Sequence, residues 1–217
     1  MRQLTFTDAA KTLVGDNGRF VQIGAFDGRR GDHMRYFVDN CGWRGVCVEP
    51  IPDAMAELRK NYTGIDGMTF VEAAIWTEPG PKVMHYLPFE AHFKGGVPLS
   101  VLSCSSFWQE LVKDCEGMRE SITVNCMTLN QLFRHAKVEA FDVFQCDAEG
   151  ADYEIVKQLD LDKWRPTIVQ FESRQTTEEQ VADCDRWFTE HGYGFRHGRC
   201  DYTAWRLDAQ AAAEEAE

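Results

Sequence analysis

Four acidic side chains stand where short apolar runs of this sequence end. They are Asp27, Glu49, Asp147 and Glu172, and each follows a run typical of a buried strand. Because the carboxyl ends of parallel strands lie at one edge of a sheet, we expect these carboxylates to face one ligand site. Carboxylates gathered in this way can attract a cationic ligand or accept a proton from a substrate.

The turn after the first apolar run, FVQIGAFDG (residues 20–28), narrows the choice of ligand. Its glycines are Gly24 and Gly28, whereas a dinucleotide site needs G-x-G-x-x-G so that a pyrophosphate can reach backbone N–H groups. A carboxylate at Asp27 would repel pyrophosphate, but Asp27 and Asp32 would suit an ammonium or a sulfonium. S-Adenosylmethionine carries both cations. The alternative is a purely structural turn in which Asp27 caps the next helix.

The next two strand ends fit the nucleoside part of such a ligand. Glu49, followed by Pro50, can accept hydrogen bonds from both ribose hydroxyls at the end of the second strand. Ala73 and Ala74 are small enough to let an adenine ring approach the backbone after the third strand. Taken singly, Glu49 could be a solvated glutamate before a loop, and the two alanines could be ordinary core residues.

The carboxylates of the fourth and fifth strands are the candidates for catalysis. Asp147 and Glu149 surround the end of the fourth strand in QCDAEG, and Glu172 ends the fifth. Asp147 is the first candidate for a general base, followed by Glu149 and Glu172, and then by His85 or His92. Glu149 could instead be a charge that stabilises a helix N-terminus. Asp147 and Glu172 could also share Mg²⁺, but this is not favoured, and no set of metal ligands is assigned.

An alternation of apolar runs and amphipathic stretches indicates an α/β fold with a mostly parallel sheet in a single domain, residues 1–217. The expected strands are 19–23, 43–50, 68–75, 141–150 and 164–173, with a weak strand in 78–87 and a closing pair in 195–207 around Gly198. The expected helices are 31–42, 51–62, 128–136, 151–159 and 176–192. We expect an irregular substrate or lid segment at about 88–127 and a frayed acidic tail at 208–217.

Composition excludes several classes of partner. The formal net charge of −12 opposes binding to nucleic acid or to anionic lipid. No apolar stretch is long enough to cross a bilayer and the N-terminus lacks an export pattern, so we expect a cytoplasmic protein that does not bind membranes. The eight cysteines are scattered without a C-x-x-C pair, which favours reduced thiols over disulfides or structural zinc.

Together, these residues resemble the FkbM-type S-adenosylmethionine-dependent methyltransferases. The resemblance spans residues 20–207 and rests on these blocks, in the family's order: QIGAFDG, GDHMRYFV, GWRGVCVEPIPDAMAELRKNY, FVEAAIW, VNCMTLNQL and FDVFQCDAEGADYEIVKQLD. It implies the Rossmann-like class I methyltransferase fold, with a seven-stranded sheet, helices on both faces and an antiparallel strand near the C-terminus.

The resemblance also implies roles for individual residues. It implies cofactor contacts at Gly24, Ala25, Asp27 and Gly28, ribose binding at Glu49, and adenine contact near Ala73 and Ala74. We expect further cofactor contacts at Phe26, Asp32, Pro50 and Asp147. It implies an active-site edge at Asp147 and Glu149. The sequence departs from the family at Gln22, where an aspartate is frequent, and at Phe26, where a small polar residue is frequent.

The expected activity is methylation of a hydroxyl on a small molecule or a sugar, with S-adenosylmethionine as the methyl donor. The alternatives are a non-catalytic module that binds the cofactor and, less favoured, a nucleotide-binding oxidoreductase. The sequence names neither the acceptor nor an oligomeric state.

Overall fold

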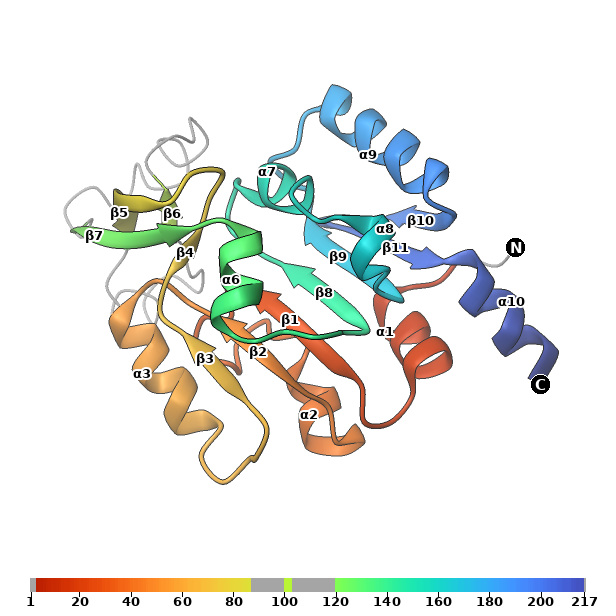
Figure 1. The fold of residues 1–217 in the computed structure, drawn as a ribbon, viewed down its shortest axis with the longest axis horizontal. Coiled ribbons are helices and arrows are strands. Elements are labelled where there is room, and N and C mark those ends of the chain that lie inside the picture. The colour runs from red at the N-terminus through yellow and green to blue at the C-terminus, as the bar shows by residue number, and fades with distance from the viewer. Residues whose placement is uncertain (1–2, 87–99, 103–119, 217) are drawn as a thin grey trace.

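The computed structural model describes residues 3–86, 100–102 and 120–216. Its centre is a seven-stranded sheet in the order β10-β11-β9-β8-β1-β2-β3 (Figure 1). Its strands are β1 (Arg19–Ile23), β2 (Arg44–Val48), β3 (Thr69–Val71), β8 (Val143–Cys146), β9 (Ile168–Glu172), β10 (Tyr193–His197) and β11 (Asp201–Arg206). The strands from β9 to β3 are parallel, and β11 runs antiparallel to both of its neighbours. The expected α/β class and sheet are confirmed.

Helices cover both faces of this sheet because its central strands are apolar on both sides. All four residues of β8 are buried, as are four of the five in β1 and in β9. One face packs against α6 (Leu129–His135), α7 (Asp152–Val156), α8 (Leu161–Trp164) and α9 (Glu178–Glu190). The other packs against α1 (Phe6–Ala9), η1 (Ala10–Val14), α2 (Arg35–Cys41) and α3 (Pro52–Asn61).

A second sheet of four strands lies beside the first, at the upper left of Figure 1. Its order is β4-β7-β5-β6, and its strands are β4 (Ala74–Ile75), β5 (Gly80–Tyr86), β6 (Ser100–Leu102) and β7 (Glu120–Met127). Its apolar side, which includes Met84 and Val124, packs against Ile51 and Ala54 at the start of α3. The second sheet is thereby fixed next to the carboxyl ends of β2 and β3.

This second sheet corrects two expectations. The single strand expected at 68–75 divides into β3, which pairs with β2, and β4, which pairs with β7. The segment expected to be irregular contains β7, whose buried or half-buried Ile122, Val124 and Cys126 alternate with exposed residues. That alternation is the period of a strand with one buried face, and a search for continuous apolar runs does not reveal it. The remainder of that segment, 88–99 and 103–119, lies outside the described residues.

Threonine side chains cap some of the helices, and a proline opens another. Thr128 caps α6 and Thr177 caps α9, and both form capping boxes with the glutamine three residues later. Pro52 is the first residue of α3, where its missing N–H removes no hydrogen bond. The expected helix at 31–42 is shorter, because α2 begins at Arg35.

The two ends of the chain are helical. α1 and η1 were not expected, and the tail forms α10 (Leu207–Ala216), which is anchored where Trp205 Nε1 donates to Gln210 Oε1 at 2.8 Å. The closing pair β10 and β11 turns tightly, with the Gly198 N–H donating to the Asp201 carbonyl. Among the residues described, no helix combines the length and the apolar character needed to span a membrane. The six cysteines that the structure describes are free thiols, and Cys104 and Cys115 lie outside the described ranges.

Candidate active site

Two adjoining cavities open at the carboxyl ends of β1, β2 and β8. We call the first the apolar cavity, because its wall includes Val48, Ala73, Ala74, Ile75, Met84 and Ile155. We call the second the polar cavity, because its wall includes Gln22, Phe26, Arg30, Asp32, Gln145 and Glu149. Gly24, Glu49 and Asp147 line both cavities. A ligand with an apolar end and a charged end could occupy them together.

Gly24 allows β1 and β8 to approach closely beneath both cavities. Its φ is +75°, and a Cβ at this position would overlap the carbonyl oxygen of Asp147. The N–H groups of Gly24 and Ala25 both donate to the Val48 carbonyl, which ties the turn to β2. A glycine is therefore required here by both the backbone conformation and the lack of space.

Glu49 is the carboxylate that the two cavities share. It is 2% exposed, and its two oxygens accept the N–H groups of Phe26 and Ile51, each at 2.9 Å. Burial raises the pKa of Glu49 to about 7, although these two N–H donors favour the charged form. Each carboxylate oxygen can accept more than one hydrogen bond, so Glu49 keeps capacity for two hydroxyl groups of a ligand.

Phe26 has a backbone conformation that is unusual for its type. Its φ is +45°, in the left-handed region that asparagine and glycine adopt more readily than aromatic residues. This conformation directs the Phe26 N–H to Glu49.

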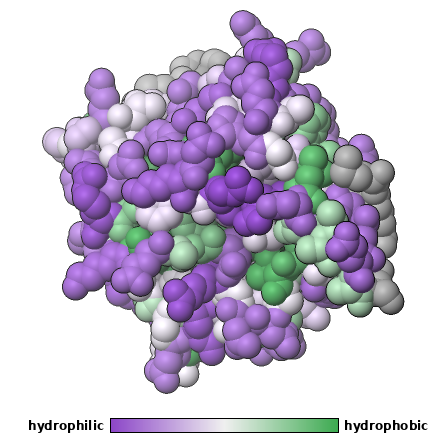
Figure 2. All heavy atoms as spheres, turned by 45° about the vertical axis from the view of Figure 1, so that its right-hand side comes forward, coloured by the Kyte–Doolittle hydropathy of each residue, from purple (hydrophilic) through white to green (hydrophobic). Residues whose placement is uncertain are grey.

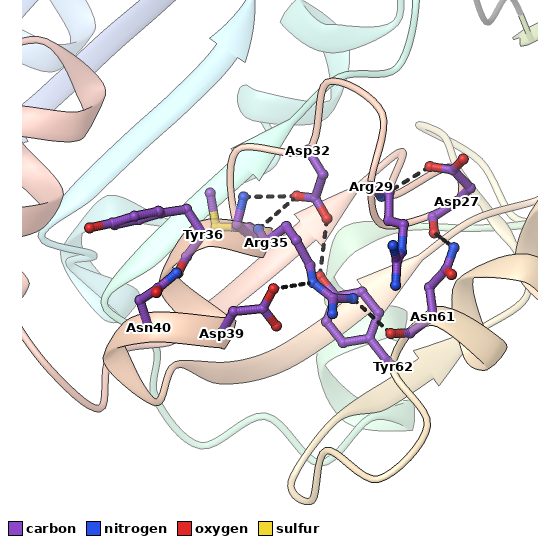
Figure 3. Close-up of polar contacts among 10 residues, drawn as sticks. Asp27, Arg29, Asp32, Arg35, Tyr36, Asp39, Asn40, Asn61 and Tyr62 are labelled. Atoms are coloured by element: carbon purple, nitrogen blue, oxygen red, sulfur yellow. Dashed lines mark hydrogen bonds and ion pairs between the residues drawn. The ribbon is translucent and has the colours of Figure 1, made fainter.

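Asp27 and Gly28 line neither cavity, contrary to the expectation that Asp27 faces a shared site. Asp27 Oδ1 accepts the N–H groups of Arg29 and Arg30, and its Oδ2 lies 3.0 Å from Arg30 Nε. Figure 3 shows that the Asn61 side chain also reaches the Asp27 carbonyl. The structure therefore gives Asp27 the role of holding the turn, because its carboxylate is already satisfied there.

Asp32 lines the polar cavity, but it organises the segment before α2. Its Oδ1 accepts Gln22 Nε2 at 3.0 Å and the Met34 N–H at 2.7 Å, and its Oδ2 accepts the Tyr62 hydroxyl at 3.0 Å. Figure 3 shows the carboxylate between α2 and the end of α3. Asp32 therefore links β1, the start of α2 and the end of α3 in the wall of the polar cavity.

Asp147, Glu149 and Glu172, which we call the acidic trio, come together at the ends of β8 and β9. Gln175 Nε2 lies 3.3 Å from Glu149 Oε2 and 3.5 Å from Glu172 Oε2, and so joins two of them. Burial, followed by the neighbouring carboxylates, raises the pKa of Asp147 to about 8 and that of Glu149 to about 9. The same causes raise the pKa of Glu172 to about 7, partly offset by Arg174.

The base candidates outside this trio lie elsewhere. His85 is on β5 of the second sheet, with its Nδ1 2.7 Å from Ser121 Oγ. His92 lies outside the described residues. Throughout the described ranges, no three histidine, cysteine or acidic side chains are placed to hold a metal ion together.

Sequence reasoning missed several residues of the site. Asp152 is 2% exposed and accepts the N–H groups of Ala148 and Gly150, so it fixes the turn that carries Asp147 and Glu149. Its spacing after QCDAEG is the signal that could have identified it. Met84 reaches the apolar cavity from the second sheet, and only the pairing of β5 with β7 reveals that position.

Comparison with known proteins places the chain among methyltransferases. The model of the methyltransferase FkbM domain matches residues 22–195, from β1 to β10. No protein of curated function matches the sequence. A crystal structure of methyltransferase FkbM from Methylobacillus flagellatus KT is similar over 88% of this chain, with 12% identity and a TM-score of 0.55. This chain spans 44% of that protein.

Two other solved structures are similar at lower TM-scores. Precorrin-6y C5,15-methyltransferase from Geobacter metallireducens GS-15 has 14% identity and a TM-score of 0.45, over 95% of this chain and 93% of its own. The methyltransferase domain of METTL16 has 13% identity and a TM-score of 0.48, over 92% of this chain and 78% of its own. The class I methyltransferase fold rests on the FkbM structure, and the family rests on the domain model. Because that model covers most of the sequence, this chain belongs to the FkbM family of methyltransferases.

Proposed function

We propose that this protein transfers a methyl group from S-adenosylmethionine to a hydroxyl of a small molecule or a sugar. The observation that carries the proposal is the buried Glu49 carboxylate, which stands where an apolar and a polar cavity meet. A nucleoside with a charged tail has the same order of parts: an apolar base, a ribose with two hydroxyls, and a charged end.

The residues present fit that cofactor. Glu49 would accept the ribose hydroxyls, and the small side chains of Ala73 and Ala74, with Pro50, leave room for the adenine. Gly24, Ala25 and Phe26 would border the sulfur and the amino acid end, since all three line the polar cavity. A side chain at Gly24 would meet the Asp147 carbonyl, so a glycine is needed where the two cavities meet.

The acidic trio would perform the proton transfer. When bound, the sulfonium supplies an activated methyl group for in-line displacement by an oxygen. The hydroxyl that is methylated must lose its proton, and a base works best when its pKa lies near the working pH. Asp147 is the first candidate because it lines both cavities and has a pKa raised to about 8. Glu149, which lines the polar cavity, would hold the acceptor and share the proton; Glu172 lines neither cavity and is joined to Glu149 through Gln175.

The charge of the protein favours neutral acceptors. A net charge of −12 and three carboxylates at the site oppose phosphorylated ligands and nucleic acid. Figure 2 shows a face on which hydrophilic side chains predominate and hydrophobic ones form small separate patches. A neutral acceptor with several hydroxyls, such as a sugar, is compatible with this negative charge and this polar surface.

Binding of S-adenosylhomocysteine, measured by calorimetry, tests the cofactor part of the proposal. We expect wild type to bind it, and Glu49→Ala to reduce the affinity about a hundredfold through loss of two charge-assisted hydrogen bonds. Glu190→Ala, which removes an exposed glutamate at the end of α9, is the matched control and should bind as wild type does. Absence of binding by folded wild type would refute the proposal.

Transfer of a radiolabelled methyl group into fractionated cell extract tests the catalytic part. We expect label in a fraction of small neutral molecules, and loss of this label in Asp147→Asn. Cofactor binding without transfer to any fraction would favour the non-catalytic module instead. A fluorescence change on titration with NADH, with no binding of S-adenosylhomocysteine, would favour the oxidoreductase.

A further inference from the structure

Three glutamines occupy neighbouring positions in the central strands of the main sheet. Gln22 on β1 is paired in register with Gln145 on β8, which is paired with Gln170 on β9. Their exposed fractions are 2%, 3% and 3%. We call them the glutamine row. A buried amide is unfavourable unless its polar atoms find partners, so each member of the row needs an explanation.

The three amides differ in their partners. Gln22 is satisfied at both ends, because its Nε2 donates to Asp32 Oδ1 at 3.0 Å and its Oε1 lies 3.7 Å from Cys47 Sγ. The Oε1 atoms of Gln145 and Gln170 have no hydrogen-bond partner among the residues that the structure describes. Gln145 and Gln170 thus carry buried acceptors that are ready for a donor from elsewhere.

Only one of these two open acceptors adjoins the proposed cofactor site. Gln145 lines the polar cavity together with Gln22 and Arg30, whereas Gln170 lines neither cavity. Gln145 also lies two residues before Asp147, which directly follows β8 and whose N–H donates to the Ile23 carbonyl of β1, and both residues line the polar cavity. An unpartnered and almost fully buried acceptor in the wall of a cavity indicates that a ligand supplies the donor.

We propose that Gln145 binds the α-amino acid end of S-adenosylmethionine, with its Oε1 accepting a hydrogen bond from the ammonium. This inference rests on the proposed function. Gln22 cannot serve in the same way, since Asp32 and Cys47 already engage its amide, and it positions the wall instead. Arg30 also lines the polar cavity, and its guanidinium would pair with the carboxylate of the ligand's amino acid end.

A neutral amide is the appropriate group at this place. Asp147 and Glu149 already line the same cavity, and the charge of Asp147 helps to raise the pKa of Glu149. A further carboxylate in the middle of β8 would add to that repulsion, and burial would penalise its charge. Gln145 offers a hydrogen-bond acceptor to the ammonium without adding a charge to the acidic edge.

The test compares two ligands that differ at the amino acid end. S-Adenosylhomocysteine has this end, and 5′-methylthioadenosine lacks it. Their affinities for wild type, Gln145→Met and Gln170→Met are measured by calorimetry. Methionine has nearly the volume and flexibility of glutamine, and Gln170→Met removes an amide of equal burial that lies away from both cavities. Thermal unfolding of each variant reports whether the fold is intact.

We expect Gln145→Met to weaken S-adenosylhomocysteine at least tenfold and to leave 5′-methylthioadenosine within twofold, and we expect Gln170→Met to change neither. Equal affinities in Gln145→Met and wild type would overturn the inference, since a buried water would then satisfy Oε1. A similar loss for both ligands would also overturn it, because the effect would then not be specific to the amino acid end. If wild type binds neither ligand, the proposed function itself fails.

Discussion

The first turn and the acidic trio both contain carboxylates at the ends of parallel strands, but these carboxylates differ in their partners. In the first turn, the carboxylate of Asp27 accepts backbone N–H groups and contacts Arg30. In the trio, the nearest charges are mostly other carboxylates, and the pKa values of Asp147 and Glu149 are raised to about 8 and about 9. The same residue type therefore holds the backbone in one region and is prepared to take a proton in the other.

Glu49 stands between these two cases. It accepts two backbone N–H groups, as Asp27 does, yet burial raises its pKa to about 7. It also lines both cavities, which Asp27 does not. The comparison indicates that position at a cavity, together with incomplete satisfaction of the carboxylate, distinguishes a ligand-binding acid from a structural one.

Gly24→Ala should have the largest effect, because Gly24 is where the two regions touch. The added Cβ would overlap the Asp147 carbonyl, and φ at this position is +75°. We expect the free energy of unfolding to fall by about 3 kcal/mol or more, measured by urea denaturation.

Gly64→Ala is the control for this prediction. Gly64 has a similar φ of +81°, but an added Cβ would meet nothing within 4 Å. It should therefore show only the cost of the backbone conformation, about 1 kcal/mol. Equal losses in the two variants would show that β1 and β8 can separate at the site without penalty.

The free energy of unfolding should depend on pH, because the carboxylates of the acidic trio are buried close to one another. Carboxyl pKa values in the unfolded chain lie near 4, whereas those of Asp147 and Glu149 in the folded protein are about 8 and about 9. Between these limits the folded state binds more protons, so its stability falls as pH rises. The stabilisation is complete below about pH 4 and is lost progressively between about pH 4 and pH 9, and we expect a loss of several kcal/mol over that range in the ligand-free protein.

Denaturant melts across that range measure this loss. The variant that combines Asp147→Asn with Glu149→Gln has no charge to gain at these positions and should show a flatter profile. A stability of the wild type that rises with pH would mean that the trio is charged and satisfied in the folded state.

Much of the main sheet could be predicted from the sequence because its strands are buried on both faces. The apolar runs of β1, β8 and β9 can be recognised in the sequence without knowing which strands lie beside them. β4 has two residues, and its place is decided by pairing with β7, which no local pattern encodes. The second sheet was therefore missed, and with it the contribution of Met84 to the apolar cavity.

The site could be predicted in its location but not in its internal contacts. The strand ends locate Glu49, Asp147 and Glu172, because the topology of a parallel sheet fixes where those ends meet. Whether a carboxylate faces a cavity or turns back to the backbone depends on the conformation of its loop. Asp27 and Asp32 have the residue type that a cation would need, but their hydrogen bonds go to the turn and to α2.

Asp27→Asn gives the smallest expected change and the sharpest separation of the two kinds of carboxylate. Asp27 Oδ1 accepts both N–H groups of the turn, and an asparagine can retain these two hydrogen bonds through its own Oδ1. Only the contact of Oδ2 with Arg30 is lost, and Arg30 is partly exposed. We expect about 0.5 kcal/mol less stability in urea melts.

The affinity of Asp27→Asn for S-adenosylhomocysteine should stay within twofold of wild type, in contrast to the loss expected for Glu49→Ala. Calorimetry of the two variants side by side gives the comparison directly. A tenfold weaker affinity in folded Asp27→Asn would show that its carboxylate reaches the cofactor when the ligand is bound. The turn would then have to release Arg30 on binding, because Asp27 Oδ2 lies 3.0 Å from Arg30 Nε without the ligand.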